Sequence, residues 1–424
     1  MSITTSLDDA GTGPFRAAAV RFVPVFRRKP RIPRREAGDR LDFVEGMRGL
    51  AALYVVLGHF VSMVDPRFVV GGRAASPAWL RPFLAPFLYG HLAVAAFIVI
   101  SGFCLQWSLF RSGHGTLPAA GLRRFFRRRA MRILPAYYAC LALSILVTAT
   151  VTVRYAGTMP FDTYLPLSRE TVLSHVLLVH NLSPDHMYKL NGVLWSIAIE
   201  AQLYLVFPLL VWSLWRWGRP ATLVGALIVA GAALWLVPGA GKLYFWFLPL
   251  FGAGMAAAHL AFRPDLRRGV RPNAASLLAV ALVGLTLLGT LGKIMIAWTD
   301  LAFGFAVAAF LYRVVVAPGS LSERLLAWRP LVGLGVFSYS LYLVHHPMLQ
   351  VFWSLKPHVF VSSRASLAYL LVVALPLIVA FAWGFAQLFE RPFMARAKRR
   401  ERSPDARRAA LALPLRAAGE IAVR

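Results

Sequence analysis

Long apolar segments recur throughout this chain, and they restrict its fold more than any other feature of the sequence. Each is close to the roughly 20 residues that an α-helix needs to cross the hydrocarbon core of a bilayer. A helix satisfies its own backbone hydrogen bonds in lipid, so these segments are predicted to be transmembrane helices. Their approximate bounds are 47–64, 88–110, 133–153, 193–215, 221–238, 243–262, 274–292, 297–317, 331–352 and 366–388. The sequence therefore predicts an all-α, polytopic membrane helix bundle of about ten transmembrane helices.

Composition and charge agree with a membrane protein. Hydrophobic residues make up 58% of the 424 residues and charged residues only 15%, which excludes an ordinary soluble domain. The net charge of +28 does not fall on a nucleic-acid-binding motif, so we expect no nucleic acid partner. Instead, about 35 of the 46 Lys and Arg residues lie on one side of the predicted topology. The positive-inside rule places that side, with both termini, in the cytosol. We expect a multi-pass protein of the inner (plasma) membrane.

The apolar segments divide the chain into three regions. Residues 1–46 are basic and do not show the pattern of a signal peptide, so we expect a disordered cytosolic arm there. Residues 47–390 are expected to form the transmembrane domain, and residues 391–424 a basic cytosolic tail. The lipid bilayer is thus the first expected partner. We expect no second globular domain, and we find no internal repeat of the kind that many secondary transporters show.

Arg48 and His59 lie in the first apolar segment, eleven residues apart. This spacing is three helical turns plus about 20°, so both side chains share one helix face, with the histidine about 16 Å deeper. An ionisable side chain at that depth is costly and is by default a candidate functional group. The pair is therefore the strongest candidate site in the sequence.

Glu200 is the one acidic residue of the segment 193–215 and is expected about 10 Å below the opposite membrane surface. His59 and Glu200 would then lie at similar depths. For a buried carboxylate the alternative is a structural charge pair. Trp195 and Tyr204, each taken alone, are more typical of interfacial and packing aromatic residues.

Arg129 and Arg132 end a basic stretch before the third apolar segment. They share a helix face and suit bidentate recognition of phosphate, and Arg48 is expected at the same surface. This pattern favours a site for a polyphosphate ligand. The alternative is a positive-inside flank on anionic lipid, and the spacing does not separate the two.

Histidines elsewhere give weaker signals. His345 and His346 are expected about 21 Å along the ninth segment, and a satisfied polar contact between helices is our interpretation of His346. The loop 154–192 contains His175, His180 and His186, spaced by five and six residues. This spacing matches no metal-ligand motif, so we expect a structural or solvated role and no metal.

Three further features have ordinary explanations. Cys104 and Cys140 lie in separate segments and are expected to be packing residues. The small pair Ser101-Gly102 is explained by close helix packing. Glu390 lies at an inner boundary, where charge is common, and receives no role from its spacing.

These elements, taken in order, resemble the acyltransferase-3 family, whose members are integral membrane acyltransferases that modify sugars. Each motif alone is weak, whereas the ordered set is strong and extends from about residue 47 to 393. The motifs are Arg48 with His59, Ser101-Gly-Phe103, Arg129-x-x-Arg132 before Pro135, Trp195-Ser196 with Glu200 and Tyr204, Ser338-Tyr-x-Leu-Tyr-Leu-x-His345, and Phe389-Glu390 with Pro392.

The resemblance implies transfer of an acyl group, commonly acetyl, from cytosolic acyl-CoA to a carbohydrate hydroxyl at the far side of the membrane. It implies that His59 is the catalytic histidine, that Arg48 is its partner in the motif, and that Arg129 and Arg132 hold the donor. Glu200 is expected to orient the imidazole or stabilise its cation. We expect Trp195, Ser196, Tyr204 and His345 to contact substrates. Some members carry an additional SGNH-type domain, which we do not expect in this chain.

Two chemical routes and one other function stay open at this point. His59 either acts as general base on the acceptor hydroxyl or first takes the acyl group itself. The acceptor is expected to be a glycan or a lipid-linked sugar. The alternative function is a proton-coupled or anion transporter, because a buried histidine and glutamate at one depth also suit a proton relay.

Overall fold

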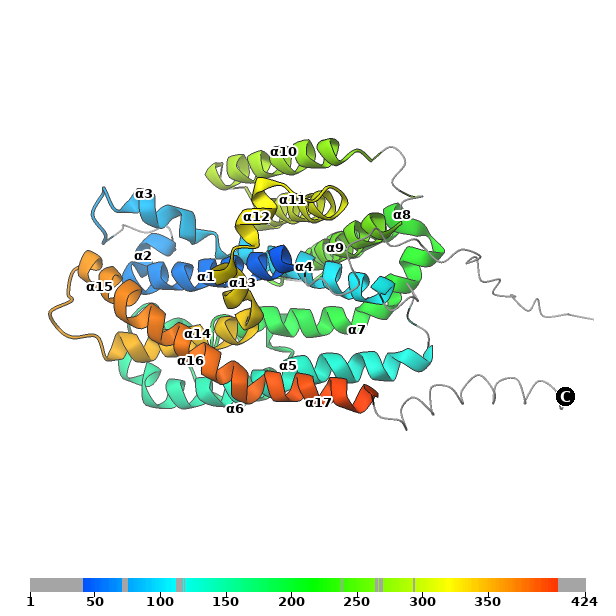
Figure 1. Ribbon diagram of the computed structural model, residues 1–424. Coiled ribbons are helices and arrows are strands. Elements are labelled where there is room, and N and C mark those ends of the chain that lie inside the picture. Colours follow the sequence, from blue (N-terminus) through cyan, green and yellow to red (C-terminus); the bar gives the residue numbers. More distant parts are fainter. Residues whose placement is uncertain are drawn as a thin grey trace, which may run out of the picture.

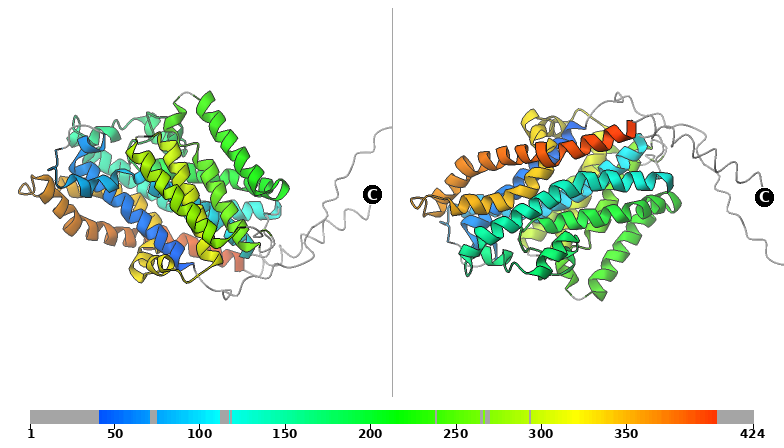
Figure 2. Two further views of the ribbon diagram at one scale, coloured as in Figure 1. Left: turned by 90° about the horizontal axis from the view of Figure 1, so that it is seen from above. Right: turned by 90° about the horizontal axis from the view of Figure 1, so that it is seen from below.

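The computed structural model describes residues 41–402 apart from 71–74, 112–116, 118, 238, 264–265, 267–269 and 293. Within these residues the chain is a bundle of helices, and it contains no β-strand (Figure 1). Most of the long helices run along one common direction, as the two further views also show (Figure 2). The predicted all-α bundle is confirmed.

Each predicted transmembrane segment coincides with a helix or with a pair of consecutive helices. These are α1 (Asp42–Val64), α4 (Gly90–Arg111), α5 (Ala119–Thr150), α7 (Leu194–Arg216), α8 (Gly218–Leu236), α9 (Phe247–Phe262), α10 (Pro272–Leu291), α11 (Ile296–Val316), α13 (Arg329–Val336) with α14 (Ser338–Ser354), and α15 (Ser363–Tyr369) continuing through the π-helical turn η7 (Leu370–Ala374) into α16 (Leu375–Phe389).

Eight helical stretches among the described residues are long and apolar enough to cross a membrane. Two other predicted segments are shorter: α9 has 16 residues and α14 has 17. The outside of the bundle is apolar as well. Leu277, Val280, Leu288 and Leu291 on α10 are 68–78% exposed, and Trp235 on α8 is 85% exposed. Such a surface is stable against lipid rather than water. The protein is a multi-pass membrane protein.

Shorter elements connect these helices. They are α2 (Pro66–Val69), α3 (Arg81–Leu84), η1 (Ala85–Leu88), η2 (Thr152–Tyr155), η3 (Phe161–Tyr164), α6 (Arg169–Val176), η4 (His180–Leu182), η5 (Ala240–Lys242), α12 (Leu321–Leu326) and α17 (Arg391–Arg402). The longest predicted loop, 154–192, holds η3, α6 and η4, and it packs against α5 and α7 through hydrogen bonds from Tyr137 and Gln202.

Three boundaries differ from the prediction. Helix α1 begins at Asp42, so the last residues of the predicted arm 1–46 are helical, whereas residues 1–40 lie outside the described part. Helix α5 has 32 residues and includes the basic stretch before the third segment, because nothing in that stretch breaks a helix. The predicted tail 391–424 starts as α17, and residues 403–424 lie outside the described part.

Glycines allow two pairs of elements to approach at backbone distance. A Cβ atom on Gly102 of α4 would lie 2.1 Å from the Phe251 carbonyl oxygen of α9, and one on Gly254 of α9 would lie 2.0 Å from the Val99 carbonyl oxygen of α4. Similarly, a Cβ on Gly335 of α13 would lie 1.9 Å from the Glu45 carbonyl oxygen of α1. The close packing predicted for Gly102 is confirmed. These contacts hold α4 beside α9 and α1 beside α13.

Candidate active site

Two cavities lie inside the bundle and meet at Val94 of α4 and Tyr342 of α14, which line both. The first has a volume of about 210 Å³ and contains three arginines, so we call it the arginine cavity. The second has a volume of about 350 Å³ and contains His59 and His91, so we call it the histidine cavity. Arg48 and His59 share a face of α1, and each contributes to a different cavity.

The arginine cavity brings together six of the predicted site residues from three helices. Helix α1 supplies one, α5 two and α7 three. They are Arg48, Arg129, Arg132, Ser196, Glu200 and Tyr204. The long helix α5 places its two arginines one turn apart on the cavity side, as the sequence spacing predicts. Arg48 forms an ion pair with Glu45 at 3.7 Å, one turn earlier on α1.

Glu200 is the centre of a hydrogen-bonded group in this cavity. The hydroxyls of Ser101 and Tyr204 both donate to Glu200 Oε1, the first at 2.8 Å, and the two hydroxyls lie 3.0 Å apart. The guanidinium carbon of Arg129 lies 5.6 Å from the centre of the Tyr204 ring, within cation–π range. Ser101 therefore contributes to the site, while its neighbour Gly102 serves packing.

The expected contact between Glu200 and His59 is not found among the described residues. Helix α1 packs on α4, α13 and α14, whereas α7 packs on α5, α8 and α9. Glu200 and His59 were predicted at similar depths, but their helices are not close neighbours, so the two side chains do not meet. Glu200 lines the arginine cavity and His59 the histidine cavity.

His59 has histidine neighbours instead. Its Nδ1 lies 2.9 Å from the Val55 carbonyl oxygen and 3.4 Å from His345 Nε2. A carbonyl oxygen only accepts hydrogen bonds, so Nδ1 of His59 carries the proton and Nε2 keeps its lone pair. The same reasoning applies to His345, whose Nδ1 lies 3.1 Å from the Leu341 carbonyl oxygen. His345 Nε2 is thus an acceptor facing the Nδ1–H group of His59.

His346 is a second neighbour that the sequence did not predict for the site. Its ring centre lies 5.2 Å from that of His59. Gln350 Nε2 lies 3.2 Å from His346 Nδ1, and Nε2 of His346 is buried without a hydrogen-bond partner in the described residues. The interpretation of His346 as a fully satisfied polar group is therefore wrong for Nε2.

Trp195 and Ser196 are adjacent on α7 but face different cavities. Ser196 Oγ lies 2.7 Å from the Tyr342 hydroxyl in the arginine cavity. Trp195 lines the histidine cavity, where its ring stacks on Tyr244 with centres 4.2 Å apart. Tyr188 and Tyr244 line the same cavity. Neither tyrosine was predicted for the site, because both lie outside every motif.

Glu390 was also missed. It is buried, accepts a hydrogen bond of 2.7 Å from Ser340 Oγ, and lines a side cavity of about 240 Å³ with Arg48 and Arg132. Its place in the Phe389-Glu390 motif was the only signal that pointed to it. The side cavity next to the arginine cavity thus contains acidic as well as basic groups.

Outside the two cavities, the histidines of the 154–192 loop have a structural place. His175 and His180 are fully buried, and their rings stack with centres 3.8 Å apart. Burial lowers the pKa of His175 to about 4 and that of His180 to about 3. Among the described residues, no group of three or more His, Cys, Asp or Glu side chains is arranged to hold a metal ion.

The fold and the ordered motifs define a class, the integral membrane acyltransferases. The chain belongs to the acyltransferase-3 family: the family's sequence profile, described as an acyltransferase domain, matches residues 41–386. The resemblance noted from the motifs is confirmed.

Several curated proteins are similar to this chain. O-acetyltransferase OatA of Staphylococcus aureus is 24% identical over 336 residues, covering 72% of this chain and 51% of OatA. The putative peptidoglycan O-acetyltransferase YrhL of Bacillus subtilis is 26% identical over 289 residues, covering 61% and 44%. Nodulation protein 10 of Rhizobium leguminosarum is 32% identical over 157 residues, covering 35% and 39%. The chain thus spans about half the length of OatA. No solved structure matches it.

Proposed function

We propose that this protein is an O-acyltransferase of the inner (plasma) membrane that moves an acetyl group from cytosolic acetyl-CoA to a carbohydrate hydroxyl of a surface or exported glycan. The observation that carries the proposal is the pair of cavities that meet at Tyr342, with arginines in one and His59 in the other. The names of OatA and YrhL, both O-acetyltransferases, support acetyl as the group. The name of YrhL supports a glycan as acceptor.

The arginine cavity suits the donor. Arg48, Arg129 and Arg132 would bind the phosphates of CoA through charge-assisted hydrogen bonds, with guanidinium groups matched to phosphate oxygens. The pantetheine arm would extend along the cavity toward Tyr342 and bring the thioester near the histidine cavity. Glu200, with Ser101 and Tyr204, would hold this wall in place and keep Arg129 oriented over the Tyr204 ring.

His59 would carry the chemistry. The hydrogen bond from its Nδ1–H group to Val55 fixes one tautomer and leaves Nε2 able to accept a proton or to attack the acyl carbon. His345 Nε2 faces that Nδ1–H group and would stabilise the positive charge that develops on the ring in either route.

The test uses membranes from cells that produce the full-length protein, supplied with radiolabelled acetyl-CoA. We expect label to appear in alkali-labile ester linkage on glycan, and His59→Ala to abolish it. General acid–base groups typically contribute about 10²–10⁴-fold. The matched control is His358→Ala, which removes an exposed histidine from the loop between α14 and α15 and should have no effect.

Binding of acetyl-CoA in the same membranes checks that His59→Ala is folded, because this variant should still bind acetyl-CoA in the arginine cavity. Two results would overturn the proposal. One is uptake of label across the membrane without ester formation, which is the behaviour of a transporter. The other is ester formation at the parental rate by folded His59→Ala.

A further inference from the structure

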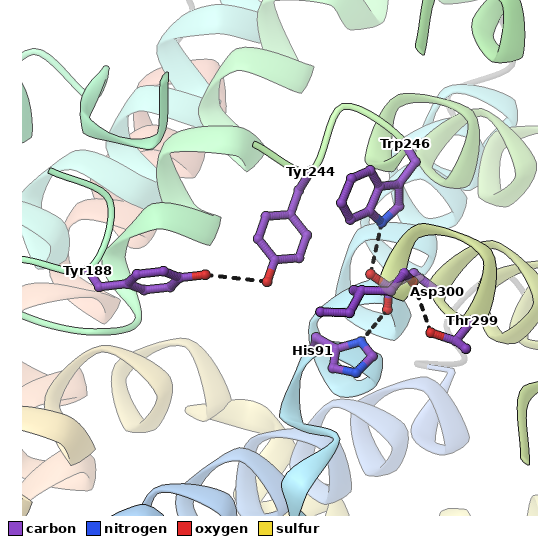
Figure 3. A network of polar contacts seen from close by, with 7 residues as sticks. His91, Tyr188, Tyr244, Trp246, Thr299 and Asp300 are labelled. Carbon is purple, nitrogen blue, oxygen red and sulfur yellow. Dashed lines mark hydrogen bonds and ion pairs between the residues drawn. The ribbon is translucent and has the colours of Figure 1, made fainter. Parts of the chain in front are cut away.

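We propose that His91, held by the buried carboxylate of Asp300, takes the proton from the acceptor hydroxyl in the histidine cavity, while His59 carries the acyl group. This inference rests on the proposed function and goes further, because it assigns two roles to two histidines. It starts from a polar network that none of the sequence motifs includes (Figure 3).

The network joins three elements at the end of the bundle where α4 and α11 begin. His91 is the second residue of α4, and Asp300 lies in the first turns of α11. His91 Nδ1 lies 2.6 Å from Asp300 Oδ1, and Trp246 Nε1–H donates to Asp300 Oδ2 at 2.8 Å. In Figure 3 the imidazole and the indole approach the carboxylate from two sides.

The burial of Asp300 makes this pairing more than a surface contact. Its side chain has no exposed area, and an ionisable group inside a membrane bundle is costly unless it is paired. Here each carboxylate oxygen has a nitrogen partner. The His91 side chain keeps 14% of its area exposed. The carboxylate therefore orients the ring by accepting a hydrogen bond at Nδ1.

The other ring nitrogen of His91 is the group available to a ligand. Among the described residues the structure records no hydrogen bond to His91 Nε2, and His91 lines the histidine cavity together with His59. With Nδ1–H donated to Asp300, Nε2 carries a lone pair and can accept a proton. The cavity thus has two imidazoles with an available Nε2, one from α1 and one from α4.

The remaining walls suit a sugar. The stacked rings of Trp195 and Tyr244 line the cavity, and the hydroxyls of Tyr188 and Tyr244 lie 3.4 Å apart and point toward each other (Figure 3). Aromatic faces bind the C–H face of a sugar ring, and tyrosine hydroxyls supply hydrogen bonds. A volume of about 350 Å³ is within the usual range for a small-molecule site.

A single histidine cannot both carry the acyl group and accept the proton of the acceptor hydroxyl, whereas two histidines can divide these roles. If His59 Nε2 attacks the thioester, a bond forms from Nε2 to the acyl carbon, the carbon–sulfur bond breaks, and CoA leaves as the thiolate, which takes a proton from water. The acylated His59 nitrogen can no longer accept the proton of the acceptor. In the second step the acceptor oxygen forms a bond to the acyl carbon, its proton passes to His91 Nε2, and the bond to His59 Nε2 breaks with its electron pair returning to that nitrogen. His91 then releases the proton to water.

The experiment measures ester formation with radiolabelled acetyl-CoA in the same membranes, for His91→Gly with and without added imidazole. We expect loss of transfer of about 100-fold or more, because general bases contribute about 10²–10⁴-fold, with a tenfold or greater gain on adding imidazole. Acetyl-CoA binding should be unchanged, and samples stopped by rapid denaturation at neutral pH should show labelled protein accumulating at His59. Asp300→Asn should lower transfer and also accumulate labelled protein. His358→Gly is the control, which imidazole should not affect.

The outcomes separate this inference from the proposed function. Wild-type transfer with an equally active His91→Gly overturns the role of His91 and leaves the proposed function standing. Loss of transfer with donor binding intact but no rescue by imidazole assigns His91 a structural role and also overturns it. If His91→Gly misfolds and no longer binds acetyl-CoA, His91→Gln is tested in its place. Transfer by His91→Gln at the wild-type rate would also overturn the role of His91. Absence of transfer by the wild-type protein overturns both proposals together.

Discussion

In the proposed function, Arg129 and Arg132 would each contribute to the site without touching the reacting atoms. Both line the arginine cavity, on the far side of Tyr342 from His59. Contacts to the CoA phosphates would exist equally in the ground state and in the transition state. Such contacts lower the KM for the donor without raising kcat.

We therefore predict that Arg129→Ala and Arg132→Ala each weaken acetyl-CoA binding by about 1.5–3 kcal/mol, the usual range for hydrogen bonds to charged groups, with a small effect on kcat. Steady-state kinetics with varied acetyl-CoA measure both quantities. Arg123→Ala, on the exposed face of the same helix, is the control. Unchanged donor dependence in both variants would limit these arginines to a topological role.

A second prediction at this scale concerns His175 and His180. Their folded pKa values, about 4 and about 3, lie below the unfolded value of about 6.5 because the rings are buried. The unfolded loop therefore binds protons between these values while the folded loop does not. Stability is complete above about pH 6.5 and falls as the pH is lowered through that value. At pH 5 each ring should cost about 2 kcal/mol.

Hydrogen exchange of the segment 169–182 at pH 7.5 and pH 5 measures this effect, and exchange should be faster at pH 5. Replacing both histidines with Phe should remove the pH dependence if the variant folds, while His358→Gln should retain it. Equal protection at both pH values in the parental protein would contradict the assignment.

Residue periodicity predicted some of this site and could not predict the rest. The eleven-residue spacing of Arg48 and His59 correctly gave one helix face, because helical period is a local property. The predicted contact of Glu200 with His59 was wrong because such a contact depends on which helices are neighbours. His91 and Asp300 are 209 residues apart in the sequence, so their pairing needed the folded bundle.

At the scale of elements, the apolar segments predicted the helices well, and their ends less well. Hydropathy marks where lipid contact ends, whereas helix α5 continues into its basic stretch because backbone hydrogen bonding continues there. The break between α13 and α14 was also hidden in one apolar run, 331–352. Gly335, which lies against the backbone of α1, is two residues before that break.

The crossing of α4 and α9 gives a prediction at this scale. Gly102→Ala and Gly254→Ala would each place a Cβ atom within about 2 Å of a carbonyl oxygen, and backbone cannot move aside as a flexible side chain can. Overpacking typically costs about 1–3 kcal/mol. We expect a lower Tm in detergent for both variants. Gly225→Ala on α8, where nothing lies within 4 Å, is the control and should not lower the Tm. Parental Tm values for both test variants would show that the crossing is looser.

At the scale of the whole molecule, the bundle must adopt one orientation in the membrane. In Figure 1 helix α1 begins toward the end of the bundle where α17 lies, and α15 lies at the opposite end. An even number of crossings is consistent with this arrangement. The distribution of basic residues predicts that the N-terminus and the C-terminus of the chain both face the cytosol.

Reporter fusions test the orientation. A periplasmic-type enzyme reporter fused after Arg424 should be inactive, and the same reporter inserted in the loop between α14 and α15, at His358, should be active. The reverse pattern would invert the topology and would place the arginine cavity away from cytosolic CoA.

The meeting of the two cavities at Tyr342 also has a consequence for which acyl groups are accepted. The Tyr342 hydroxyl contacts Ser196, and its ring lies 5.7 Å from that of Phe97, so this contact is closely packed. The charged carrier would stay on one side, and only the acyl chain would reach His59. Each additional methylene at such a contact changes selectivity by about 10–200-fold. We expect the parental protein to prefer acetyl-CoA over butyryl-CoA, and Tyr342→Ala to reduce that preference at least tenfold in competition assays, whereas Tyr138→Ala should not. If Tyr342→Ala leaves the preference unchanged, another residue limits the length of the acyl chain. If the preference falls, the side chain that lies between the two cavities also determines which acyl group the glycan receives.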